Sequence, residues 1–285
     1  ITDSLPAIAL GMQPKDKSIM KDHPRNPNEG VFAGNGLKLT LGYGIIITIC
    51  VVISYLHHRQ NMKLLRSVSS PNRGTGAERR LVIRMLRRGV HPKAIFHDLY
   101  LQKRNGEFAQ IDIVVATPQG LLAIEVKDYS GWLFGNEKQR YWTQVLNYGK
   151  EKYRFYNPIM QNAGHIKALR EQSEQFAHLP IFNVVLFAGN CTLKNVNYWA
   201  DNTFVGYASN ISYVLKKMNE FRLAQYTDKR EVVRVLRKAV ENGNNPDIVI
   251  SHMASVQRKA IGQPQPTTSW RPHIFRINWR RLIRY

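Results

Sequence analysis

Two carboxylates and one lysine on neighbouring predicted strands are the residues best placed to do chemistry. Asp112 lies in an apolar run, and Glu125 and Lys127 lie in the next one, after a Pro-Gln-Gly turn. Because side chains alternate along a strand, Glu125 and Lys127 share a face, and Asp112 can lie beside them across the hairpin. Carboxylates are ligands that Mg²⁺ prefers, and a lysine can orient or help deprotonate water and neutralise a phosphate. The spacing therefore predicts metal-assisted hydrolysis of a phosphodiester.

Further motifs lie on either side of these strands. Upstream, residues 74–78 read Gly-Thr-Gly-Ala-Glu and open a basic helix with apolar residues at helical spacing. Downstream, Trp132 and Trp142 precede residues 157–162, which read Asn-Pro-Ile-Met-Gln-Asn, and His165 follows. An Asp followed later by Glu-x-Lys is frequent by chance and can be a solvated strand surface. The agreement of several separate motifs therefore carries more weight than the triplet alone.

In this order and spacing, residues 74–190 resemble the nuclease-related domain (NERD) family, a branch of the PD-(D/E)xK nuclease superfamily. The resemblance implies an α/β fold with a restriction-endonuclease-like core, in which helices flank a mixed central sheet. It also implies a nuclease that depends on Mg²⁺ or Mn²⁺, with nucleic acid as its partner and DNA as the expected substrate. Carried over residue by residue, it gives the catalytic set Glu78, Asp112, Glu125, Lys127 and Gln161 and the metal ligands Asp112, Glu125 and Glu78.

The chain departs from the family pattern at two positions. Ala77 stands where glycine is usual, and Ile113 stands where histidine is frequent. Alanine adds one methyl group and favours a helix, so we expect the first change to be tolerated. Isoleucine has no donor for a phosphate, so any substrate contact from that position is lost. We interpret His165 as a packed helix residue and the two tryptophans as core or rim.

Composition points to a polyanionic partner. Lys and Arg outnumber Asp and Glu by 41 to 20, which gives a formal net charge of +21. Such an excess favours nucleic acid, an anionic membrane surface, or both. The chain of 285 residues, 44% of them hydrophobic, has room for one ordinary domain with extensions. The two cysteines, Cys50 and Cys191, argue against a disulfide framework and a cysteine-ligated zinc site.

The run from Leu39 to Leu56 is free of charged residues. At about eighteen residues it is long enough to cross a hydrocarbon core of roughly 30 Å. A polar segment precedes it, which argues against a cleaved signal peptide. Basic residues crowd its C-terminal side, so we expect the catalytic domain in the cytoplasm. With the family resemblance, this predicts a single-pass protein of the bacterial inner membrane.

The chain divides by composition into five segments. They are a flexible tail (1–36), a membrane helix (37–57), a basic juxtamembrane linker (58–73), a nuclease-like domain (74–227) and a basic extension (228–285). In the extension, arginines alternate with aromatic residues, a pattern that suits phosphate contact and base stacking. Membrane headgroups or simple packing against the domain also suit it. The arginines expected to contact nucleic acid are Arg271, Arg276, Arg280, Arg281 and Arg284.

Hydrophobic periodicity and turn residues predict the elements of the domain. Helices are expected at about 77–88, 157–177, 211–221 and 230–241. Strands are expected at about 94–101, 121–127, 131–134, 140–146, 183–188 and 203–207, with one more carrying Asp112.

Two functions fit these observations. The favoured one is a membrane-anchored, metal-dependent nuclease, with defence against foreign DNA or DNA processing as its role. The rival is a membrane-tethered nucleic-acid-binding or scaffold protein whose nuclease fold is catalytically silent. The intact set of acids and lysine favours the first. Neither the choice between DNA and RNA, nor endo against exo cleavage, nor the oligomeric state follows from the sequence.

Overall fold

The structure is a computed structural model that describes residues 35–261. The chain divides after His58 into two compact units. In the first unit, helix α2 (Gly36–Arg66) carries an 18-residue window of mean hydropathy 2.2, none of it buried. By length and composition this helix can cross a membrane. It continues as a helix to Arg66, through the first part of the expected linker, and Leu65 joins the core of the second unit.

A five-stranded mixed sheet forms the centre of the second unit. Its strand order is β1-β2-β3-β7-β9, with β1, β2 and β3 antiparallel and β7 and β9 parallel to β3. The strands are β1 (Ile95–Gln102), β2 (Phe108–Thr117), β3 (Gly120–Lys127), β7 (Ile181–Phe187) and β9 (Thr203–Tyr207). Strands β3 and β7 are mostly apolar and are buried up to Val126 and along the whole of β7, because both faces of the sheet are covered.

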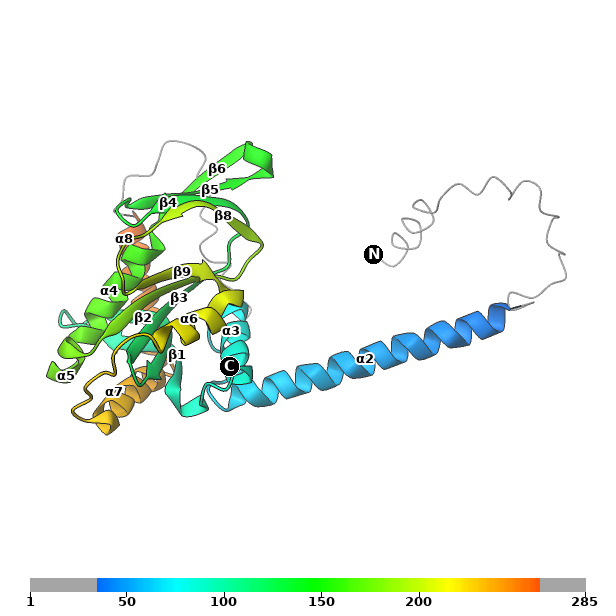
Figure 1. Cartoon of the computed structure of the whole chain (residues 1–285), viewed down its shortest axis with the longest axis horizontal. Helices are drawn as coiled ribbons and strands as arrows, with labels where there is room; N and C mark the ends of the chain where they lie inside the picture. The colour runs from blue at the N-terminus through cyan, green and yellow to red at the C-terminus, as the bar shows by residue number, and fades with distance from the viewer. Residues whose placement is uncertain (1–34, 262–285) are drawn as a thin grey trace. The chain divides into compact units, whose positions relative to one another are not determined.

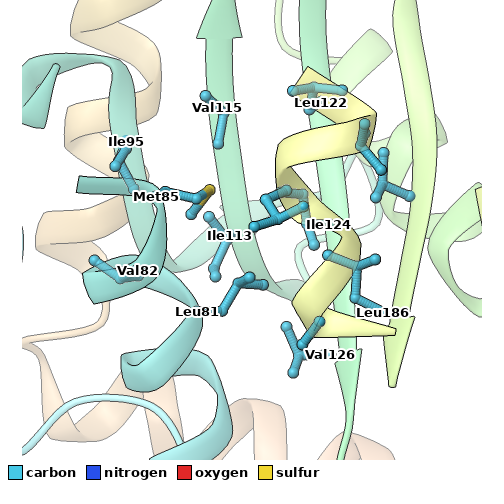
Figure 2. Close-up of a cluster of buried hydrophobic side chains, with 14 of the residues drawn as sticks. Leu81, Val82, Met85, Ile95, Ile113, Val115, Leu122, Ile124, Val126 and Leu186 are labelled. Atoms are coloured by element: carbon cyan, nitrogen blue, oxygen red, sulfur yellow. The ribbon is translucent and has the colours of Figure 1, made fainter. Parts of the chain in front are cut away.

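Helices cover both faces of this sheet (Figure 1). On one face lie α3 (Gly76–Arg87) and α6 (Ile211–Met218). On the other lie α4 (Pro158–Arg170), α5 (Glu174–His178) and α7 (Lys229–Asn242). Figure 2 shows the first of these layers, where Leu81 and Met85 of α3 face Ile113 and Ile124 of the sheet. The α/β fold with a mixed sheet flanked by helices confirms the expected fold class.

A second sheet continues beyond the end of the first (Figure 1). Its order is β6-β5-β4-β8, with bounds β4 (Gly131–Asn136), β5 (Tyr141–Leu146), β6 (Glu151–Tyr156) and β8 (Cys191–Asn197). Residues 128–130 join β3 to β4, and residues 188–190 join β7 to β8, so a parallel pair is continued by a parallel pair. The joint requires Gly131, because its φ is +77° and a Cβ there would lie 2.3 Å from the Val145 carbonyl oxygen.

Three parts of the second unit differ from the expected elements. The helix expected over 157–177 is interrupted at residues 171–173, where Ser173 is extended, and becomes α4 and α5. Strands β6 and β8 were not expected, because their half-exposed faces carry polar and charged residues in place of an apolar run. Helix α8 (Pro246–Ile261) was also not expected.

The packing of α3 on the sheet gives a stability prediction. Leu81 is 1% exposed, so Leu81→Ala should lower the free energy of unfolding by about 2–5 kcal/mol through lost burial and a residual cavity. Urea unfolding measures the change in free energy. The control is Leu223, which is 71% exposed, and Leu223→Ala should change the free energy of unfolding by less than about 0.5 kcal/mol. Equal losses for the two variants would show that α3 does not pack as described.

Candidate active site

Asp112 and Glu125 lie together at the end of the central sheet where β3 terminates. The β2–β3 register pairs Ile113 with Ile124, so Asp112 stands opposite Glu125 one step further along. There the Asp112 side chain turns across the strands, and its Oδ2 accepts the Val126 N–H at 2.8 Å. Both carboxylates are buried, with Asp112 7% and Glu125 2% exposed. The expected convergence of the two acids is thus present in the structure.

A short polar chain holds Asp112 from the other side. Gln110 Nε2 donates to Asp112 Oδ1 at 3.2 Å and to Asp98 Oδ1 at 3.3 Å. Asp98, opposite Asp112 in the β1–β2 register, has a φ of +57°, a strained conformation for a residue with a side chain. Arg73 Nε donates to Asp98 Oδ2 at 3.2 Å, which compensates its charge. The strain is thus located beside the site and is held by an ion pair.

Lys127, Gln161 and His165 surround Glu125. Lys127 Nζ lies 2.6 Å from Glu125 Oε1 and donates to Gln161 Oε1 at 2.9 Å. Gln161 Nε2 in turn donates to Glu125 Oε1 at 2.8 Å, so the amide bridges the acid and the lysine. His165, one helical turn after Gln161 on α4, places Nδ1 3.3 Å from Glu125 Oε2. The helix that begins at Asn157-Pro158 therefore supplies two side chains to the site.

The charges in this cluster shift one another's pKa values. Burial raises the pKa of Asp112 well above its usual range, and the nearby Glu125 and Glu78 raise it further. Burial also acts to raise the pKa of Glu125, but the Lys127 charge and the His165 side chain outweigh it and lower the pKa to about 2. Burial acts to lower the pKa of Lys127, and its pairing with Glu125 outweighs this and raises the pKa. Glu125 and Lys127 are therefore charged at neutral pH, and Asp112 is the acid that most readily holds a proton.

Glu78 has a structural position next to this cluster. It closes a capping box with Thr75 at the start of α3, where its Oε1 accepts the Thr75 N–H at 3.0 Å. Its Oε2 lies 3.2 Å from Nε2 of the buried His97. Both oxygens are thus in use, although the carboxylate is close enough to raise the pKa of Asp112. In this arrangement Glu78 caps α3, contacts His97 and acts on Asp112, and its expected catalytic and metal-ligand roles stay predictions.

The donor set fits a hard divalent cation held by two carboxylates. Glu125 Oε2 is buried, and His165 Nδ1 lies 3.3 Å from it without the geometry of a hydrogen bond. The raised pKa of Asp112 marks a carboxylate whose burial the nearby positive charge does not offset. Within residues 35–261, no three His, Cys, Asp or Glu side chains are grouped so that they alone could hold a metal ion. Mg²⁺ commonly binds one or two carboxylates and completes its shell with water and substrate phosphate, so two are sufficient.

Four residues contribute to the site although the sequence did not predict this role for them. Gln110 shares a strand face with Asp112 two residues on, a signal that alternation offered. His165 lies four residues after Gln161 on one helix face, yet was interpreted as packing only. Asp98 and Arg73 carried no local signal, because their pairing joins segments 25 residues apart.

The remaining predicted positions have varied locations. Trp142 is fully buried as expected, and Trp132 is 37% exposed on the second sheet. Ala77 lies buried in the first turn of α3, and Ile113 is buried in the core on the side away from Asp112. The arginines expected to contact nucleic acid, from Arg271 to Arg284, lie outside the described residues.

Comparison with known proteins places this architecture in a family. The family model described as "Nuclease-related domain" matches residues 73–188. An uncharacterized protein of Bacillus anthracis is 33% identical over 189 residues, which cover 66% of this chain and 85% of that protein. The chain belongs to the nuclease-related domain family. The resemblance of residues 74–190 to this family is thereby confirmed, and no solved structure matches the chain.

The N-terminal part of this family member is similar to a different kind of protein. A family model described as "Cation transporting ATPase, C-terminus" matches residues 1–88. A calcium-transporting ATPase of Listeria monocytogenes is 48% identical over 54 residues, and one of Bacillus subtilis is 38% identical over 61 residues. These matches cover 19% and 21% of this chain but only 6% and 7% of the ATPases. Composition alone did not indicate this similarity.

The raised pKa of Asp112 gives a test of its electrostatic environment. A carboxyl whose pKa is raised by folding binds protons more tightly when folded, so its contribution to stability falls as pH rises from the unfolded value. In EDTA, Asp112→Asn should therefore unfold at a higher temperature than wild type at neutral pH. This difference in melting temperature should shrink toward pH values below about 4, where carboxyl groups are protonated in both the folded and the unfolded state.

The matched control is Asp128→Asn. The Asp128 side chain is 56% exposed and lies 3.5 Å from Arg80, so its removal should alter the melting temperature little. Calorimetry in EDTA at neutral and acidic pH measures both variants. A lower melting temperature for Asp112→Asn at neutral pH would mean that the ionised carboxylate is well compensated in the folded protein.

Proposed function

We propose that this protein is a metal-dependent nuclease that hydrolyses phosphodiester bonds in nucleic acid, with DNA as the expected substrate. The observation that carries the proposal is the buried cluster of Asp112, Glu125, Lys127 and Gln161 at one end of the sheet. A carboxylate oxygen without a hydrogen bond and a carboxyl with a raised pKa are costly to bury. A fold that only needed stability would gain from replacing them, whereas a metal site requires them.

Asp112 and Glu125 would hold Mg²⁺ or Mn²⁺ in this proposal. The bound cation would supply Lewis-acid activation of water and neutralise charge on the phosphate. Lys127 is charged because its pairing with Glu125 raises its pKa, so its role is to orient water and to balance phosphate charge rather than to act as a base. Gln161 holds the side chains of Lys127 and Glu125 in place through its two hydrogen bonds. His165 limits the freedom of the other Glu125 oxygen.

A basic surface on α7 supports nucleic acid as the substrate class. Arg230, Arg234, Arg237 and Lys238 are exposed on this helix, and Glu241 is the one acid beside them in the same groove. The formal charge of +21 makes a polyanion the natural partner of the whole chain. A second cleft, lined in part by Arg80 and Arg84 of α3, opens near the ends of β7 and β9.

Helix α2 supports a membrane anchor. Its apolar side chains are exposed around the helix, and no described residue buries the 18-residue window. The similarity of residues 1–88 to part of a cation-transporting ATPase agrees with this, because a protein that transports calcium must itself cross the membrane. Basic residues after the helix favour the cytoplasm for the nuclease domain in a bacterial inner membrane.

Substitutions at the cluster test the chemistry. Glu125→Gln and Lys127→Met should each lower the cleavage rate by roughly 10²–10⁴-fold, because each removes a charge that acts on the metal or the phosphate. Gel assays on single- and double-stranded DNA and RNA, with Mg²⁺, Mn²⁺ or EDTA, measure the rates. Lys93, an exposed lysine two residues before β1, provides the matched control Lys93→Met, which should cleave as wild type does.

The outcomes separate the two candidate functions. Cleavage by wild type that EDTA stops and both variants lose supports the nuclease. Variants that cut at the wild-type rate would exclude this cluster as the active site. Binding without cleavage on every substrate and metal would leave the silent, nucleic-acid-binding scaffold instead.

The anchor is tested by charge placed in the apolar run. The chain should stay with membranes through high-salt and alkaline carbonate washes, as a spanning helix does. Ile46→Arg/Ile47→Arg should release it, since each arginine near the centre of a span costs about 2.5–3.5 kcal/mol. Ile46→Leu/Ile47→Leu is the matched control. Release of wild type by salt alone would indicate an electrostatic, peripheral attachment.

A further inference from the structure

The second sheet has one face that no described helix covers. Its inner side chains, Leu133, Trp142 and Phe155, pack toward β7 in a buried cluster. The register pairs Tyr141 with Tyr156 and Trp132 with Val145, which directs these residues to the opposite side. We call this side the outer aromatic face, and the residues on it that matter for binding are Trp132, Tyr141, Lys152, Arg154, Tyr156 and Lys194.

Cations and aromatic rings alternate over the outer aromatic face. Lys194 Nζ lies 5.2 Å from the Trp132 ring centroid, and the Arg154 guanidinium lies 5.2 Å from that of Tyr141. Tyr156 packs edge-on against Tyr141, with centroids 6.2 Å apart. Of the five cation–π contacts within the described residues, four lie on or beside this sheet, so the pattern is local to it.

The acids near this face do not neutralise it. Glu137 is engaged by the backbone N–H groups of Trp199 and Ala200, and Glu151 accepts from Tyr153 and Asn147. Lys138, Arg140, Lys152, Arg154 and Lys194 on and beside this sheet outnumber these two acids, so the surface carries net positive charge. A positive surface with accessible rings is complementary to a strand that offers both phosphates and bases.

We propose that the outer aromatic face binds unpaired nucleotides of the strand that is cleaved at the Asp112–Glu125–Lys127 cluster. This rests on the proposed nuclease function and names its substrate class as nucleic acid with a single-stranded segment. Trp132 and Tyr156 are 37% and 41% exposed, enough for a base to stack on each ring. The exposed cation–π contacts are weak, about 0.5–1 kcal/mol each, so a base can displace the cation, which then pairs with a phosphate.

Unpaired bases fit better than a duplex. In a duplex the base faces are stacked inside, and only phosphates and groove edges are accessible, so charge without aromatic rings would be sufficient. The exposed rings add affinity only where base faces are free. The sheet is also a short continuation of the strands that carry the cluster. Trp132 follows Lys127 by five residues, at most about 18 Å of extended chain, a distance that a few nucleotides can span.

Binding to the whole chain in detergent, measured in EDTA, tests the surface independently of cleavage. Trp132→Leu/Tyr156→Leu keeps apolar volume but removes both rings. It should weaken binding of oligo(dT) by roughly tenfold while leaving binding of a blunt duplex within about twofold. Lys152→Glu/Arg154→Glu should weaken oligo(dT) further and lower the salt slope by about 1.4 for two lost phosphate contacts. Trp132→Phe/Tyr156→Phe should restore binding, and unchanged melting temperatures would show that the variants fold.

Lys93→Glu/Lys216→Glu is the matched charge control, since both lysines are exposed on other parts of the domain. It should retain oligo(dT) affinity within about threefold at about 0.1 M salt, because it changes net charge alone. Equal loss in this control would overturn the proposal by showing that net charge decides binding. Unchanged oligo(dT) binding by Trp132→Leu/Tyr156→Leu would also overturn it. A variant that loses binding to anionic phosphatidylglycerol vesicles but not to oligo(dT) would do the same. Specific binding without any cleavage would sink the nuclease and leave the surface standing.

Discussion

The burial of two carboxylates at the end of the central sheet is the constraint on which the surrounding structure depends. Removing Asp112 and Glu125 from water costs free energy that each must recover from its neighbours. Glu125 recovers it from Lys127 and Gln161, and its pKa falls to about 2. Asp112 accepts from the Val126 N–H and the Gln110 amide, but burial and the charges of Glu125 and Glu78 keep its pKa raised. The imbalance between the two acids is what a bound cation would relieve.

The strain near Asp112 follows from the same constraint. A regular strand would direct its side chains alternately to the two faces of the sheet, where hydrophobic clusters lie. The left-handed conformation of Asp98 disturbs this alternation opposite Asp112, and Arg73 compensates the charge that results. Arg73 also donates to the Val240 carbonyl at the end of α7, so the helix is tied to the same network. The segment around Arg73, strand β1 and helix α7 thus together fix the position and the charge balance of the site.

The second sheet gives the nuclease-related domain a surface that the central sheet lacks. Both faces of the central sheet are covered by helices, and the cluster lies at the end of the sheet where β3 terminates. Strands β3 and β7 continue past that end into β4 and β8. The chain thereby carries an exposed face of aromatic and basic residues out from the cluster. Helix α2 is long and apolar enough to cross a membrane, and the formal charge of +21 is consistent with the proposed nucleic-acid substrate.

The sequence by itself determined the family, the mixed α/β fold and the identity of the cluster. Asp112, Glu125 and Lys127 could be found because the alternation of a hairpin is a local property of the chain. The charge-free run of α2 could be found because length and composition alone define a candidate span. Polar strands such as β6 and β8 could not, since a half-exposed strand gains its stability from pairing and not from its own apolar residues. The partners of Asp112 and Glu125 also needed the tertiary structure, because Asp98, Arg73 and His165 come from distant segments, and only folding decides which buried charge meets which.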